Sequence, residues 1–516
     1  MKTAFDLAPV ALAVVLLAGC RTQPPHSGPR AIATGPEVNY IKSYPAIPAR
    51  PEALQFPPFH FQPPHAATYR VPLTSGPVAY VAEDRELPLV TITLSVHTGD
   101  WVEPPGKEGL TDLCGQLLTR AGTAHRTAQE LDERLAFLAA NLSSSMGGAQ
   151  GSVTLNLLSK DLDEGLAILR EVLTQPRFQE DRLALYKQQS LQTMKQRNDE
   201  SANIERLETG YLAYGEQFWD NRNATAASLA SVTREDLLAF HRRWFFPSNF
   251  VVAASGDFDR ATLVTKLEQL FAHWPWTDAP PPPIPQAVTM APAGIYLMDK
   301  DVNQGRVTLL LPGIMRDNPD YFPILIMNEI FGGGGFTARI VNRVRSDEGL
   351  AYAVGSSFPG GVYFPSCFRA SFQSKSRTVA YALSLIIEEM KRMAAEPVST
   401  EELENAKSGF IDRLPRSFAS KSQIVGMLAG EEFTGRYQTD PDFWQHVAAK
   451  VRAVTKADVQ RVAQQYLTPD RLVILIVGDK AEILKGHPNH AVKLESLGTI
   501  HDRPLRDPLT LEPLHQ

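Results

Sequence analysis

The stretch Val232-Thr233-Arg234-Glu235-Asp236-Leu237 returns later in the chain as Val454-Thr455-Lys456-Ala457-Asp458-Val459. Both copies run on without a gap to a Gly-Asp pair, and every pair of positions is separated by 222 residues (454 − 232). In each copy a threonine precedes an aspartate by three residues, which is typical of a helix N-terminus. A proline then ends the helix, and a strand rich in β-branched residues leads to the Gly-Asp turn. An ungapped match of this length indicates an internal duplication and therefore two related halves.

The hydrophobic pattern around this repeat predicts an α+β fold. Apolar and polar residues alternate over 152–157, as in a strand with one buried face, and leucines follow at helical spacing over 162–173. In the second half, Val307, Leu309 and Leu311 precede a predicted helix, Tyr321–Ile330. Strands and helices occur in mixed order, which favours antiparallel sheets with helices on one face. We therefore expect two tandem homologous halves, each with one such sheet.

Proline clusters divide the chain into segments. Proline is frequent from Arg21 to His65, which denies that segment helix or central-strand structure, and a second cluster runs from Pro275 to Pro292. Beyond Lys485 the chain becomes polar again, so we expect a loosely held tail. The predicted segments are a leader at 1–20, a tether at 21–66, an N-terminal domain at 67–276, a linker at 277–292, a C-terminal domain at 293–485 and a tail at 486–516.

Composition excludes several classes of protein. Hydrophobic residues make up 43% and charged residues 21% of the 516 residues, as in globular proteins and unlike disordered or polytopic membrane chains. The formal charge of −6 (51 − 57) has no basic block, so we expect no nucleic-acid partner. Three cysteines are too few for a disulfide scaffold.

The first twenty residues are typical of an export signal. Lys2 is followed by a mostly apolar run from Leu7 to Leu17, which is too short to span a membrane. The ending Leu17-Ala18-Gly19-Cys20 resembles a bacterial lipobox, in which Cys20 would be lipidated; the alternative is an ordinary cleavage near Gly19. We expect a lipid-anchored envelope protein, at the outer membrane and facing the periplasm, because Arg rather than Asp follows Cys20.

Several motifs in order resemble the insulinase/pitrilysin family of zinc peptidases, the inverted zincins, and specifically its processing-peptidase-like branch. The resemblance covers roughly residues 67–485 and implies two halves that close like a clamshell around an extended peptide. Its motifs are Thr98-Gly99-Asp100-Trp101-Val102-Glu103, the stretch from Glu108-Gly109-Leu110-Thr111-Asp112 through Gly122-Thr123, Gly332-Gly333-Gly334-Gly335-Phe336-Thr337-Ala338-Arg339, Arg345-Ser346-Asp347-Glu348-Gly349-Leu350-Ala351-Tyr352 and both Gly-Asp repeats.

The metal motif of that family, His-x-x-Glu-His, is degenerate in this chain. Residues four apart share a helix face, so two imidazoles can reach one Zn²⁺ while the glutamate acts as general base. The motif falls on Asp112-Leu113-Cys114-Gly115-Gln116, and residues 186–198, where the third ligand belongs, contain no Asp or Glu. We therefore expect no metal bound by this chain, no activity from this chain alone, and zinc in a partner subunit.

The other half of the family's site is retained. In two-subunit members the resemblance implies that one chain supplies zinc while its partner grips the substrate with a glycine-rich segment and an Arg/Tyr pair. Arg345 and Tyr352 match that pair, and Gly332, Gly333, Gly334 and Gly335 match the glycine segment. An arginine offers five donors in a fixed fork suited to carbonyls or carboxylates, and a tyrosine hydroxyl can donate to a developing oxyanion.

The sequence thus predicts a non-catalytic, substrate-binding subunit of a heterodimeric insulinase-like zinc metallopeptidase in the bacterial envelope. Its expected partners are a zinc-bearing homologue, an extended peptide and, through Cys20, the membrane. Two alternatives stay open: a stand-alone envelope peptide-binding or scaffold lipoprotein, and an active zinc endopeptidase that uses Asp112 with atypical ligands.

Overall fold

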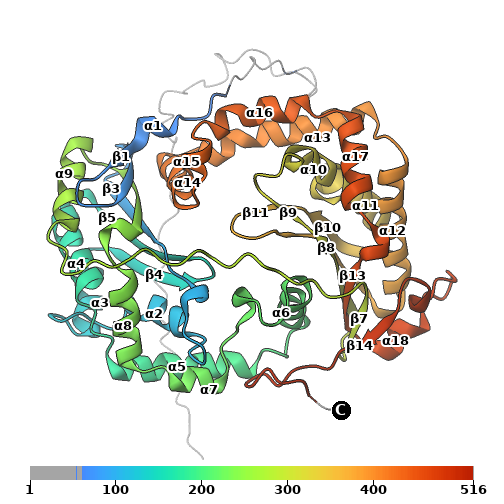
Figure 1. Cartoon of the computed structure of the whole chain (residues 1–516), viewed down its shortest axis with the longest axis horizontal. Coiled ribbons are helices and arrows are strands. Elements are labelled where there is room, and N and C mark those ends of the chain that lie inside the picture. The colour runs from blue at the N-terminus through green and yellow to red at the C-terminus, as the bar shows by residue number, and fades with distance from the viewer. Residues whose placement is uncertain (1–53, 55–60, 515–516) are drawn as a thin grey trace, which may run out of the picture. The chain divides into compact units, whose positions relative to one another are not determined.

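Alternating side chains build the sheet of the first half. In β3 (Leu89–Val96) the residues Val90, Ile92 and Leu94 are fully buried, whereas Thr91 and Thr93 between them are half-exposed. The computed structural model describes residue 54 and residues 61–514 (Figure 1). The expected leader with Cys20 and most of the expected tether at 21–66 lie outside the described residues.

The first sheet has six strands in the order β1-β2-β6-β3-β5-β4. The predicted strand over 152–157 is confirmed as β5. The other strands are β1 (Arg70–Pro72), β2 (Val78–Glu83), β4 (Asn141–Gly147), β5 (Gln150–Leu158) and β6 (Phe250–Gly256).

The second sheet also has six strands, and their order, β14-β7-β13-β8-β12-β10, matches the first sheet position by position. A separate pair of two-residue strands, β9 and β11, lies beyond β8. The strands of this half are β7 (Gly294–Asp299), β8 (Gln304–Pro312), β9 (Ile314–Met315), β10 (Ala351–Ser357), β11 (Gly360–Gly361), β12 (Cys367–Lys375), β13 (Val473–Gly478) and β14 (Ile500–Asp502).

The repeat that indicated a duplication has the same structure in both halves. Helices α8 (Arg234–Trp244) and α17 (Lys456–Tyr466) occupy corresponding positions, and each begins with a complete capping box, Thr233/Asp236 and Thr455/Asp458. The strands that follow, β6 and β13, each lie third in their sheet. The predicted α+β class with two related halves is therefore confirmed.

The sheets are mixed rather than purely antiparallel as we expected. β2 pairs in parallel with β6, β7 in parallel with β13, and β14 in parallel with β7. Each of β6 and β13 returns to its sheet after a long excursion through helices, and such a crossover, unlike a hairpin, allows parallel pairing.

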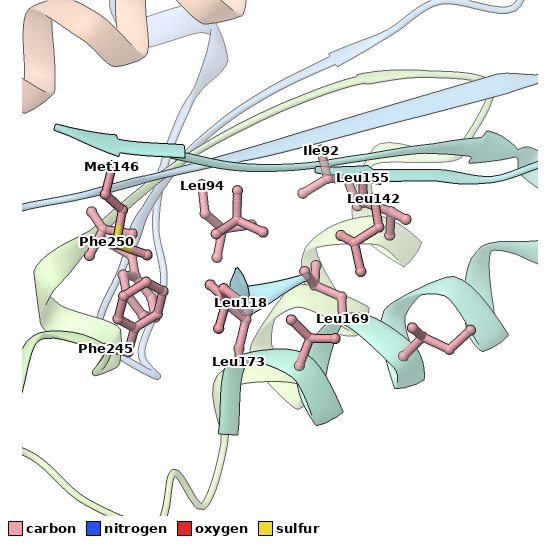
Figure 2. Close-up of a cluster of buried hydrophobic side chains, with 14 of the residues drawn as sticks. Ile92, Leu94, Leu118, Leu142, Met146, Leu155, Leu169, Leu173, Phe245 and Phe250 are labelled. Carbon is pink, nitrogen blue, oxygen red and sulfur yellow. The ribbon is translucent and has the colours of Figure 1, made fainter. Parts of the chain in front are cut away.

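Helices cover one face of each sheet and enclose a core there. In the first half, β-sheet residues such as Leu94 and Leu155 pack against Leu118, Leu169 and Leu173 of that layer (Figure 2). The helices up to the linker are α1 (Ala66–Tyr69), α2 (Leu110–Leu118), α3 (Ala128–Phe137), α4 (Leu162–Thr174), α5 (Glu180–Lys195), α6 (Ser201–Tyr214), α7 (Ala226–Ser231), α8 and α9 (Arg260–Phe271).

The second half has a corresponding layer. The helix predicted from Tyr321 is present as α10 and continues as a π-helical segment, η7 (Glu329–Gly333). The helices of this half are α10 (Tyr321–Asn328), α11 (Arg339–Val341), α12 (Val379–Ala395), α13 (Thr400–Arg413), α14 (Lys421–Phe433), α15 (Arg436–Thr439), α16 (Phe443–Ala453), α17 and α18 (Lys480–Lys485).

One helix from each half packs on the opposite face of the other half's sheet. Ile204 and Leu212 of α6 contact Leu310, Val473 and Leu475 of the second sheet. In return, α14 packs on β2 and β6 of the first sheet. The apolar side chains of this second contact are Tyr80, Ala82, Val251, Ala253, Ile424, Val425, Leu428 and Phe433. The halves are therefore joined by two exchanged helices.

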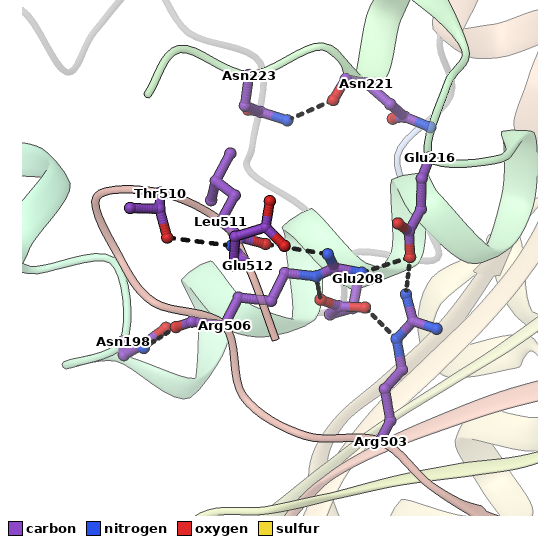
Figure 3. Close-up of polar contacts among 10 residues, drawn as sticks. All are labelled: Asn198, Glu208, Glu216, Asn221, Asn223, Arg503, Arg506, Thr510, Leu511 and Glu512. Atoms are coloured by element: carbon purple, nitrogen blue, oxygen red, sulfur yellow. Dashed lines mark hydrogen bonds and ion pairs between the residues drawn. The ribbon is translucent and has the colours of Figure 1, made fainter. Parts of the chain in front are cut away.

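The segment beyond Lys485 is anchored, which corrects our expectation of a loosely held tail. β14 extends the second sheet, and Arg503 and Arg506 then form ion pairs with Glu208 and Glu216 of the first half (Figure 3). Glu208 is only 1% exposed, so its charge requires these partners. Sequence polarity suggested a solvated tail because a local pattern cannot show that a buried carboxylate lies elsewhere in the fold.

Within the described residues no helix combines the length and the apolar character that crossing a membrane requires.

We expect the contact of α14 with the first sheet to depend on Glu432. This carboxylate is 8% exposed and accepts hydrogen bonds from Arg70 Nε (2.8 Å), Tyr80 Oη (2.8 Å) and Gln438 Nε2 (2.9 Å). Glu432→Ala leaves the partly buried guanidinium of Arg70 without its anion, so the free energy of unfolding should fall by about 3 kcal/mol or more.

Urea unfolding of the two proteins measures this difference. The control is Glu388→Ala, since Glu388 is exposed on α12 and its loss should change stability by no more than about 0.5 kcal/mol. Equal midpoints for wild type and Glu432→Ala would contradict the role assigned to Glu432.

Candidate functional site

The degenerate metal motif lies on α2 as the sequence predicts. Asp112 is exposed and Gln116 half-exposed, and they share a face of the helix because they are four residues apart. Gln116 Nε2 donates a hydrogen bond to Asp112 Oδ2 at 2.7 Å. The two side chains that replace the family's histidines are thus paired with each other.

Gly115, which stands where the general base belongs, has no space for a side chain. A Cβ atom at Gly115 would lie 2.3 Å from the backbone nitrogen of Met146 in β4. Ser144 Oγ also donates a hydrogen bond to the carbonyl oxygen of Gly115 at 2.5 Å. The helix therefore approaches the strand so closely that only glycine fits.

The donor set around α2 does not suit zinc. Asp112 and Gln116 line a cavity of about 570 Å³, to which α5 contributes the uncharged Gln189, Ser190 and Thr193. The Cys114 thiol points into the core, where burial raises its pKa, so it cannot join Asp112. Among the described residues no group of three or more His, Cys, Asp or Glu side chains is placed to hold a metal ion.

The two carboxylates of the Thr98–Glu103 stretch have structural partners. Glu103 Oε1 accepts hydrogen bonds from the backbone nitrogens of Gly109 (3.1 Å) and Thr111 (2.7 Å), so it caps the N-terminus of α2. Asp100 Oδ2 accepts from the backbone nitrogen of Gly148 at 2.7 Å. Burial raises the pKa of Asp100 to about 6 and that of Glu103 to about 7. These residues hold the helix against β4 and its turn.

The glycine segment has two different roles along its length. A Cβ atom at Gly332 would lie 2.8 Å from the backbone nitrogen of Ser356, and one at Gly334 would lie 2.5 Å from the carbonyl oxygen of Glu329. A Cβ at Gly333 would likewise meet Asn328. Gly335, in contrast, has a φ of +68°, has open space around it and lines a cavity with Arg345 and Tyr352. Only the last glycine of the predicted four borders that cavity.

Arg345 and Tyr352 lie together at the edge of the second sheet. Arg345 belongs to a π-helical segment, η9 (Asn342–Asp347), and Tyr352 to a register irregularity at the start of β10. Such irregularities re-aim side chains and are frequent beside functional sites. The guanidinium carbon of Arg345 is 4.8 Å from the centre of the Tyr352 ring and 4.6 Å from that of Phe336. Tyr352 is 85% exposed, so its hydroxyl is free to meet a ligand.

Three further charged residues line the same cavity and were missed by the sequence analysis. The cavity has a volume of about 440 Å³ and brings Arg306 of β8, Arg369 of β12 and Glu205 of α6 next to Arg345. The signal for Arg369 was present, because Arg369, Ser371 and Gln373 alternate with buried residues along one strand. That pattern alone indicates only a solvated face of the strand. The contribution of α6 could not be predicted, because no pattern within a short stretch of sequence shows that this helix packs on the other half.

The two remaining cysteines are free thiols. Cys114 is fully buried, whereas Cys367 is half-buried and its sulfur accepts a hydrogen bond from Tyr214 Oη at 3.5 Å.

Comparison with known proteins matches both halves. The family model described as insulinase (peptidase family M16) matches residues 79–213, and that described as peptidase M16 inactive domain matches residues 231–410. An uncharacterised zinc protease of Rickettsia bellii is 25% identical over 353 residues, covering 65% of this chain and 81% of that protein. The non-peptidase homologue YmxG of Helicobacter pylori is 25% identical over 343 residues, covering 66% and 78%.

A solved structure agrees with these matches. The crystal structure of a peptidase M16 inactive domain from Pseudomonas fluorescens has a TM-score of 0.70 and 25% identity, and covers 80% of this chain and 97% of that chain. The similar proteins include ones named as proteases and one named as a non-peptidase homologue, so their names alone do not decide what this chain does.

We expect that restoring the metal motif residue by residue does not restore a zinc site. Asp112→His with Gln116→His supplies two imidazoles but no third ligand, so Zn²⁺ should bind weakly and without stoichiometric retention through gel filtration. Adding Gly115→Glu should lower the melting temperature, because its Cβ would overlap the β4 backbone. Elemental analysis and thermal unfolding measure the two effects. One tightly held zinc per chain in either variant, or in the wild type, would show that other ligands complete the site.

Proposed function

Because the chain belongs to the insulinase family, peptidase family M16, and lacks that family's metal motif, we propose that it is a non-catalytic, substrate-binding subunit of a heterodimeric zinc metallopeptidase. The observation that supports this role is the juxtaposition of Arg345, Tyr352 and Gly335 around one open cavity. The motif residues on α2, by contrast, are paired with each other or closed off. The Arg/Tyr part of the family's site is thus present and open to a ligand, whereas the metal-binding part is not.

The start of β10 is suited to hold an extended peptide. β10 is the terminal strand of its sheet and pairs on one side with β12, and its residues Tyr352 and Ala353 are exposed. An extended peptide can add to such a strand through main-chain hydrogen bonds. Arg345 would then donate to a peptide oxygen, and the Tyr352 hydroxyl would reach the peptide bond. A zinc ion in the partner subunit would supply the activated water.

A stand-alone peptide-binding lipoprotein is the alternative, since the cavity is formed within a single chain. The two proposals differ in one respect, namely whether a zinc-bearing homologue must be present for peptides to be cleaved. An active endopeptidase with atypical ligands is disfavoured because α5 offers no charged ligand opposite Asp112.

We further propose that the protein is anchored at the bacterial envelope through a lipid on Cys20, at the outer membrane and facing the periplasm. The support is the sequence Leu17-Ala18-Gly19-Cys20 and the residue that follows it. Two or more acyl chains give stable anchoring, because each buried methylene contributes about 0.8 kcal/mol.

Activity should appear when this chain is mixed with a zinc-bearing homologue, and it should depend on Arg345 and Tyr352. Arg345→Ala removes a charge-assisted hydrogen bond, so kcat/KM should fall about ten- to a hundredfold. Tyr352→Phe removes only a hydroxyl, so it should lower kcat while leaving peptide binding near the wild-type value. Steady-state kinetics of the reconstituted pair measures both.

The matched control is Arg343→Lys. Arg343 lies on the same π-helical segment and does not line the cavity, and a lysine keeps the positive charge that in the wild type lies 3.7 Å from Glu348. Association of each variant with the partner is measured separately. If the pair assembles and both test variants cleave at the wild-type rate, the stand-alone binding role replaces the subunit role.

Anchorage should depend on one thiol. Cys20→Ser should move the protein from the membrane fraction to the soluble periplasmic fraction, or leave it as the unprocessed precursor. Fractionation and immunoblotting of cells that express the two proteins distinguish the cases, and Cys367→Ser serves as the control for loss of a thiol. Membrane retention of correctly processed Cys20→Ser would show that the lipobox interpretation is wrong.

A further inference from the structure

The described residues that line the cavity beside Tyr352 carry an unbalanced positive charge. Its charged lining residues are Arg306, Arg345, Arg369 and Glu205, which gives a net charge of +2 (3 − 1). Its other lining residues are uncharged, among them Phe336 and Tyr352. A concave site with uncompensated charge of one sign concentrates ligands of the opposite sign.

The single carboxylate is fully engaged and shared between two arginines. Glu205 Oε1 accepts hydrogen bonds from Thr308 Oγ1 (2.5 Å) and from Arg369 Nη2 (3.1 Å), and its Oε2 is 3.5 Å from Arg306 Nη1. The Glu205 side chain is 9% exposed, whereas those of Arg306 and Arg369 are 30% and 39% exposed. Each of these guanidiniums therefore keeps donors that face the cavity rather than Glu205.

Arg345 has no anionic partner among the described residues. Its guanidinium lies over the rings of Phe336 and Tyr352, and within the described residues its N–H groups remain available to a ligand. The nearby carboxylate of Glu348 is engaged by Arg343 instead. The planar guanidinium fork of an arginine can bind a carboxylate through two parallel hydrogen bonds.

We propose that this cavity is a subsite for a carboxylate of the bound peptide, with Arg345 as its main ligand and Arg306 and Arg369 providing the surrounding positive field. The inference rests on the proposed peptide-binding role and adds the class of peptide, one with an acidic side chain or a free C-terminal carboxylate close to the residue that reaches Tyr352. Either group presents the same planar anion, and the cavity is large enough for one terminal or acidic residue.

The test measures binding of four kinds of peptide to the full chain by isothermal titration calorimetry. All four are acetylated peptides of about ten Ser, Gly, Ala, Val and Thr residues. The first ends in a free carboxylate and the second in an amide. The third and fourth are amidated sets in which one Glu or one Gln is moved through the sequence. Either the free acid or one Glu peptide should bind about tenfold more tightly than its neutral counterpart, which identifies the source of the carboxylate.

Variants locate the effect in the cavity. Arg345→Gln should abolish the preference for the carboxylate peptide without loss of stability, because Arg345 forms no ion pair in the described structure. Arg369→Gln should weaken the preference. Lys375→Gln is the control for diffuse charge, since Lys375 lies on β12 outside the cavity and should leave the preference unchanged. Raising the salt concentration from 50 to 300 mM should weaken binding of the carboxylate peptide more than that of the neutral one.

The outcomes separate this inference from the proposed function. If all four kinds of peptide bind with equal affinity, or if Arg345→Gln keeps the preference, the carboxylate subsite is wrong while peptide binding stands. If no peptide binds at all, the proposed peptide-binding role is wrong as well.

Discussion

Buried glutamates on both exchanged helices pair with charged residues of the other half of the protein. Glu205 of α6 is paired with arginines of the second sheet, and Glu432 of α14 with Arg70 and Tyr80 of the first. A carboxylate that stays buried after losing its partner costs several kcal/mol, so each of these glutamates depends on its arginine remaining in place. Apolar contacts beneath each helix add stability, and the ion pairs add directional contacts to them.

This arrangement connects the interface of the halves to the candidate site. Glu205 is an interface residue of the first half, and among the described residues it is the one carboxylate that lines the arginine-lined cavity of the second. Arg306 and Arg369 both contact Glu205 and line the cavity. The same guanidinium groups therefore help to hold α6 on the second sheet and, in the proposed subsite, supply the positive field around a ligand.

The sequence predicted what is encoded locally and missed what is made by distant segments. The capping boxes at Thr233 and Thr455 and the alternation in β5 each lie within a few residues, so the duplicated α+β fold could be predicted. The Arg345/Tyr352 juxtaposition followed from a family resemblance. The anchored tail, the exchanged helices and the contribution of Glu205 depend on pairings across more than one hundred residues, which no local pattern contains.

The geometry of α2 shows why the two parts of the family's site differ in this chain. If only the metal ligands had been replaced, substitution by histidine could rebuild the ligand pair on this face of α2. Here Gly115 lies so close to β4 that no side chain fits, and Ser144 donates a hydrogen bond to its carbonyl oxygen. The helix can keep this position only while residue 115 has no side chain. A returning glutamate would have to push α2 away from the strand that Glu103 and Asp100 help to hold beside it. The cavity at Arg345 faces no such constraint, because its residues line open space. The degenerate motif is thus built into the packing of the first half, and the second half retains the surface that can still bind a ligand.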